Sequence, residues 1–71
     1  MFVIDLRNTL RQDVAERDST VIGSAFSLAF TQAVAGSSDQ NGHIPDSMVP
    51  AVIVRFWGLY DYHAIRVAAT C

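Results

Sequence analysis

The chain has 71 residues, of which 51% are apolar and 17% charged, so the composition excludes disorder and leaves room for a single small domain over residues 1–71. A domain of this size cannot bury all of its apolar surface, and we expect a partner to cover the remainder. The formal net charge is -2 and the five arginines are scattered, which excludes the basic stripe that nucleic acid requires.

The cysteine content and the first residues predict the compartment. Cys71 is the one cysteine, so no disulfide can form within the chain, and we expect a cytoplasmic protein. Asp5 and Arg7 fall where a secretory signal peptide would need apolar residues, so no leader is expected.

The first predicted element is a short strand over residues 2–6. Apolar side chains recur at every second position there, which is typical of a half-buried strand: Phe2, Ile4 and Leu6. Asn8 or Thr9 would then cap a short helix that ends near Arg17. The alternative is one helix from the start of the chain, with its apolar face formed by Val3, Leu6, Leu10 and Val14.

Residues 19–38 contain no charged side chain, and their apolar residues recur every three or four positions, which predicts a helix. Asp18 or Ser19 is the expected N-cap, and Gly36 the expected stop. The polar side of this helix is uncharged at Ser24, Ser27 and Thr31, so we expect a partner to cover it. A membrane span is disfavoured, because Ser, Thr, Gly and Gln interrupt the apolar run.

Residues 36–47 predict a loop with turns at Asn41-Gly42 and Pro45-Asp46. The last third fits a helical period, but its β-branched and aromatic residues favour a hairpin with strands at 51–57 and 62–68 and a turn between Gly58 and Asp61. We therefore predict an α+β fold with a short N-terminal strand, one or two helices and a C-terminal β-hairpin. An all-α arrangement of three helices is the alternative.

No catalytic or metal-binding motif is present. Asp61 and His63 would share one face of a strand and could form a carboxylate–histidine pair, but a structural or surface histidine is the simpler interpretation. His43 is expected to face solvent in the loop, and Cys71 has no base beside it. The sequence therefore predicts no enzyme activity, no metal site and no cofactor.

The densest chemical feature is a group of aromatic residues flanked by arginines, the residue types that anchor protein interfaces. We predict a partner-binding site formed by Arg55, Phe56, Trp57, Tyr60, Tyr62 and Arg66. The predicted function is a small non-enzymatic binding module that acts by self-association, or as an accessory subunit or inhibitor of a larger protein. The alternatives are a ribosomally made precursor peptide with a modified tail at residues 62–71, and a small membrane-complex subunit built around residues 19–38.

Overall fold

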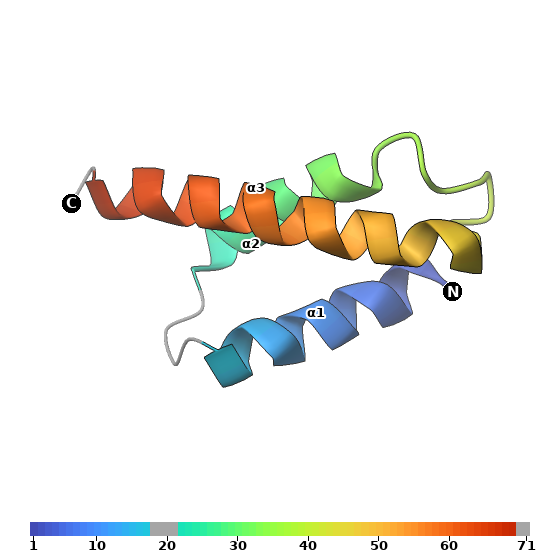
Figure 1. Cartoon of the computed structure of the whole chain (residues 1–71), viewed down its shortest axis with the longest axis horizontal. Helices are drawn as coiled ribbons and strands as arrows, with labels where there is room; N and C mark the ends of the chain where they lie inside the picture. The colour runs from blue at the N-terminus through green and yellow to red at the C-terminus, as the bar shows by residue number, and fades with distance from the viewer. Residues whose placement is uncertain (18–21, 70–71) are drawn as a thin grey trace.

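The computed structural model describes residues 1–17 and 22–69, and within these ranges the chain folds into three α-helices and one short 3-10 helix (Figure 1). The helices are α1 (Val3–Arg17), α2 (Gly23–Val34) and α3 (Val49–Ala69), and the 3-10 helix η1 (Asp46–Met48) leads directly into α3. In Figure 1, α2 crosses behind α3 in the opposite direction, and α1 lies below them, inclined to α3.

The core forms mainly between α2 and α3. On α2 the small residues Ala25, Ala29 and Ala33 are fully buried, so the two backbones can approach closely. Phe26 of α2 meets Phe56 of α3 edge to face, with ring centroids 5.2 Å apart, a favoured aromatic geometry. The other buried apolar side chains of the core are Leu6, Leu10, Val14, Phe30, Ile44, Val52 and Tyr60.

The first helix packs on this core through one narrow stripe. Leu6, Leu10 and Val14 are spaced four residues apart and are buried, whereas most other α1 side chains are exposed. The alternative of a helix from the start of the chain is therefore confirmed, and the predicted strand at residues 2–6 is wrong. Asn8 and Thr9 lie inside α1, where the Thr9 hydroxyl donates to the Asp5 carbonyl at 2.9 Å instead of capping a helix.

The predicted C-terminal hairpin is also wrong, because residues 51–57 and 62–68 belong to one continuous helix. The helical period governs here: Val52, Phe56 and Tyr60 fall on one stripe and meet α2, which outweighs the weaker strand propensity of β-branched residues. Pro50 lies in the first turn of α3, where a missing N–H costs nothing. The part of the chain that the structure describes contains no strand, so the α+β prediction fails and the three-helix alternative fits.

Two glycines shape the connection between α2 and α3. Gly36 has φ +76, and the Ser37 N–H donates to the Val34 carbonyl at 3.0 Å, which makes a turn that ends α2 as predicted. Gly42 has φ +75 within the predicted Asn41-Gly42 turn. The residue at the N-cap position of α2 is Ile22, and the predicted caps Asp18 and Ser19 lie outside the described residues.

Two glycine substitutions should have opposite effects on stability. A Cβ at Gly58 would meet nothing within 4 Å, so Gly58→Ala should raise the free energy of unfolding by about 0.5–1 kcal/mol through helix propensity. Gly36 is equally open but has a positive φ, so Gly36→Ala should lower that free energy by about 1–2 kcal/mol. Urea unfolding measures the free energy of unfolding of both variants. A loss of stability in Gly58→Ala would contradict the placement of Gly58 inside a helix.

Candidate functional site

The six residues of the predicted partner site do not share one surface. Phe56 is fully buried and Tyr60 is 4% exposed, so both lie in the core, where the Tyr60 hydroxyl accepts a bond from the Ile22 N–H at 3.4 Å. Both side chains therefore contribute to stability, and neither offers an accessible contact in the folded chain. Arg55, Tyr62 and Arg66 are exposed, and Trp57 is half-buried.

The indole of Trp57 is covered by α1 of the same chain. The Arg17 guanidinium carbon lies 4.3 Å from the indole centroid, which is a cation–π contact. Asp13 and Glu16 line the same hollow as Arg17 and Trp57. The indole thus joins the C-terminal end of α1 to the middle of α3, and replacing it would disturb the fold as well as any binding.

The exposed members of the predicted site follow one stripe of α3. Arg55, Tyr62 and Arg66 are separated by seven and four residues, which places them on the same side of a helix. The Arg66 guanidinium donates to the Tyr62 hydroxyl at 2.9 Å and lies 5.6 Å from its ring centroid. This bond holds the Tyr62 ring along the helix with 53% of its area exposed.

Apolar residues that the sequence analysis missed extend this stripe. Ile65 is 69% exposed one turn beyond Tyr62, and Leu28 of α2 is 49% exposed. Leu28 lines a shallow hollow with His63, Arg66 and Val67, so α2 and α3 meet there at the surface. We call the exposed side chains of Leu28, Arg55, Tyr62, Ile65 and Arg66 the α2–α3 face.

The exposed side of α2 continues from this face without a charge. Ser24, Ser27 and Thr31 are exposed, as the sequence analysis expected. The exposed positions of α1 differ, since they include Arg7, Arg11 and other charged side chains typical of a solvated helix. Among the described residues, the exposed side of α2 is therefore uncharged, whereas that of α1 carries several charges.

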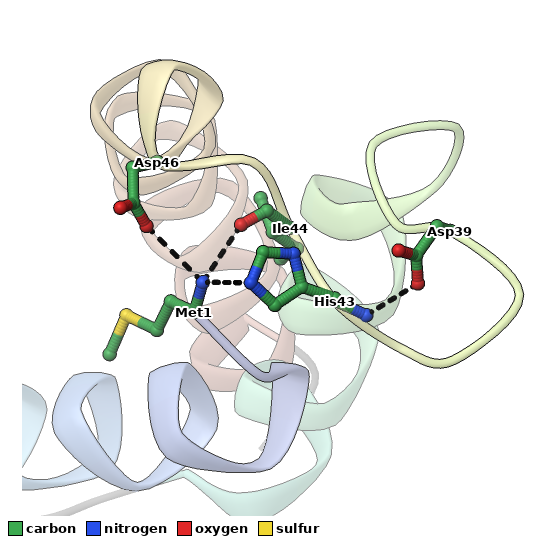
Figure 2. Close-up of polar contacts among 5 residues, drawn as sticks. All are labelled: Met1, Asp39, His43, Ile44 and Asp46. Atoms are coloured by element: carbon green, nitrogen blue, oxygen red, sulfur yellow. Dashed lines mark hydrogen bonds and ion pairs between the residues drawn. The ribbon is translucent and has the colours of Figure 1, made fainter.

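A second polar cluster joins the N-terminus to the loop before α3. Phe2 and His43 form an isolated antiparallel bridge, and Met1 and Ile44 exchange backbone hydrogen bonds of 2.8 and 2.9 Å. As Figure 2 shows, the Met1 ammonium also points toward His43 Nε2 at 3.0 Å and Asp46 Oδ1 at 3.3 Å. His43 is half-buried here, contrary to the expectation that it faces solvent.

The carboxylate of Asp39 organises the same loop. Its Oδ1 accepts the backbone N–H groups of His43 and Asn41, both at 2.9 Å, and Figure 2 shows it directed at the His43 N–H. The bond from the His43 N–H is the largest cause that lowers the pKa of Asp39 below its ordinary value of 3.8. Desolvation, the next largest cause, opposes it, and the Asn41 bond and the charges of His43 and Met1 lower the pKa further. The charged form of Asp39 therefore stabilises the folded loop.

The other chemical candidates do not assemble into a site. His63 lies on α3 and its Nε2 donates to Gln32 Oε1 at 3.0 Å, while Asp61, two positions earlier, faces a different side of the helix. Across residues 1–17 and 22–69, no three His, Cys, Asp or Glu side chains form a group that could hold a metal ion. Cys71 lies outside the described residues.

None of the helices in the described ranges has both the length and the apolar character needed to cross a membrane. Residues 62–69, the described part of the predicted modified tail, are the last two turns of α3.

Comparison with known proteins gives no match to a family model, a curated protein or a solved structure.

Removing the cover of the indole should change its fluorescence. Arg17→Gln should increase acrylamide quenching of Trp57 and lower the free energy of unfolding by about 0.5–1 kcal/mol, because the cation–π contact is lost. Trp57 is the one tryptophan, so the signal is unambiguous. Arg55→Gln, on a different side of α3, is the matched control, and equal quenching in the two variants would contradict the contact.

Loop stability should depend on pH through Asp39. Because folding lowers the pKa of this carboxyl, its stabilisation is complete above 3.8 and is lost as the pH falls through the lower folded-state value. Asp39→Asn should therefore lower the melting temperature at pH 6, and the difference from the unmodified chain should shrink below about pH 4. Thermal unfolding from pH 3 to 7 measures this, with Asp61→Asn as control; a constant difference would contradict the assignment.

Proposed function

We propose that this chain is a small non-enzymatic protein-binding module and that its contact surface is the α2–α3 face. The observation that carries the proposal is the exposure of three large apolar or aromatic side chains on this face: Leu28, Tyr62 and Ile65. Exposed apolar surface next to an uncharged helix side is typical of interaction sites, and Tyr with Arg is a common anchor pair. The Arg66 bond holds Tyr62 in place before binding, which lowers the entropy lost on association.

The charges of this face favour a partner other than a second copy. Arg55 and Arg66 lie on the stripe with Tyr62, and Asp61 lies beside this stripe, one turn before Ile65. A two-fold symmetric contact centred midway between Arg55 and Arg66 would place the arginines of the two copies against each other, which is unfavourable at close range. We therefore infer a partner segment that presents apolar side chains beside a carboxylate, with Arg66 pairing to the carboxylate.

With such a partner, the chain acts as an accessory subunit or inhibitor of another protein and does not act by self-association. A cytoplasmic location belongs to the same proposal, since the chain has a single cysteine and cannot form an internal disulfide. Arg66 is then expected to take part both in fixing Tyr62 and in binding.

Site-specific photo-cross-linking in the native host tests the contact surface. A photoreactive phenylalanine analogue is placed at Ile65 and, as the matched control, at Ile4, an isoleucine of similar exposure (69% and 73%) on α1. We expect position 65 to cross-link to a second protein through an apolar peptide that contains Asp or Glu, and position 4 to give no such product. The product from position 65 should disappear in Arg66→Glu and persist in Arg11→Glu.

Three outcomes would overturn this proposal. A product with twice the mass of the chain at position 65 would indicate self-association. The absence of a product at position 65 would exclude the α2–α3 face as the contact surface, and equal products at both positions would indicate nonspecific contact. Once the partner is identified by its cross-linked peptide, Tyr62→Ala should weaken binding by more than about 1 kcal/mol in a calorimetric titration.

A further inference from the structure

The side of α3 that faces away from α2 carries a heptad pattern of small and apolar residues. Spacings of three and four residues alternate along most of the helix, and every position is exposed. We call these positions the α3 heptad stripe: Ala51, Val54, Gly58, Asp61, Ile65 and Ala68. Its large apolar side chains, Val54 and Ile65, are 73% and 69% exposed. This alternation is the spacing with which one helix packs along another.

The core does not account for the α3 heptad stripe. α3 packs on α2 through Val52, Phe56 and Tyr60, which lie on its opposite side. A helix that is covered on one side usually carries polar or charged residues on the other, so the exposure of Val54 and Ile65 indicates a second contact. The apolar residues that the fold requires are therefore present without this stripe.

Gly58 lies near the middle of the α3 heptad stripe, at a position where the fold does not require a glycine. Its φ is not positive, and a Cβ there would meet nothing within 4 Å. Glycine in a helix interior is less stable than alanine, but it allows a second backbone to approach closely. A partner helix that crosses α3 at Gly58 would use this missing side chain.

The charges along the α3 heptad stripe distinguish between partner helices. Asp61 is the charged residue within it, and a carboxylate inside a helix contact needs a cation opposite. In a parallel pair of two copies, Asp61 would face Asp61 of the second copy. In an antiparallel pair centred on the stripe, Arg55 of each copy would lie near Arg66 of the other. Both symmetric pairs bring like charges together, which favours a helix of a different protein.

We propose that the α3 heptad stripe binds an amphipathic α-helix of a partner protein. This inference rests on the proposed function and names the structure of the partner segment, since Ile65 belongs to both surfaces and Arg55 borders the stripe. The partner helix carries apolar residues at heptad positions, a lysine or arginine opposite Asp61 and a carboxylate toward Arg55. The stripe is about 26 Å long at 1.5 Å per residue, so it binds about five turns of helix.

Photo-cross-linking in the native host from two ends of the stripe tests for a helix. A photoreactive phenylalanine analogue is placed at Val54 or at Ile65, and the control is Ile4 on α1, which is 73% exposed like Val54. We expect positions 54 and 65 to cross-link to the same protein and position 4 to give no such product. Because the two positions are 11 residues apart on α3, their attachment sites should lie about 8–14 residues apart within one helix of the partner.

A bulky side chain at the glycine tests the close approach. Gly58→Leu should lower the yield of both cross-linked products by at least about tenfold, whereas the matched control Ala15→Leu, at an exposed position of α1, should leave the yields unchanged. Asp61→Lys should also lower the yields, because it would face the cation of the partner. Gly58→Leu should remain folded, since it places a good helix former in open space, and circular dichroism checks this.

The outcomes separate this inference from the proposed function. A product at position 65 without one at position 54, or attachment sites in two different elements of the partner, would overturn the helix and leave the α2–α3 face as a binding surface. Unchanged yields in a folded Gly58→Leu variant would do the same. The absence of a product at position 65, or products with twice the mass of the chain, would overturn both.

Discussion

The contact between Phe26 and Phe56 is the interaction on which the rest of the structure depends. It joins α2 to α3 at the centre of a small core, and the buried alanines of α2 let the two helices approach closely enough for the rings to meet. Because α3 turns its Phe56 stripe inward, the stripe with Arg55, Tyr62 and Arg66 faces outward. The geometry of the α2–α3 face thus follows from the packing of the core.

The chain contains no lysine, and its arginines have a structural role beside the aromatic core. Arg7 and Arg11 lie 5.7–5.9 Å from the ring centroids of Phe26 and Phe30, and Arg17 covers Trp57. A guanidinium can stack flat on a ring and still present its N–H groups to water, which a lysine ammonium does less well. In the described part of the chain, arginines of α1 therefore cover aromatic surface that a domain of this size cannot bury completely.

The sequence predicted the charge-free helix, the stop at Gly36 and the turn at Asn41-Gly42, because these signals are local. It misled over residues 51–68, where β-branched residues favour strands and only the contact with α2 selects the helix. The candidate site was predicted in part: Tyr62 and Arg66 are exposed, but burial of Phe56 and Tyr60 depends on helix phase. The Met1 cluster was missed, since an amino terminus and a residue 42 positions away carry no shared motif.

The narrow attachment of α1 has a consequence for how the molecule opens. Three aliphatic side chains, the arginine contacts and the short bridge at its first residues hold this helix, whereas α2 and α3 share the large core. Segments with few buried contacts open locally at a lower free energy than the whole molecule. Amide hydrogens of α1 are thus expected to exchange with deuterium before those of α2 and α3. A protease would first cut the chain within α1, while α2 and α3 are still packed together.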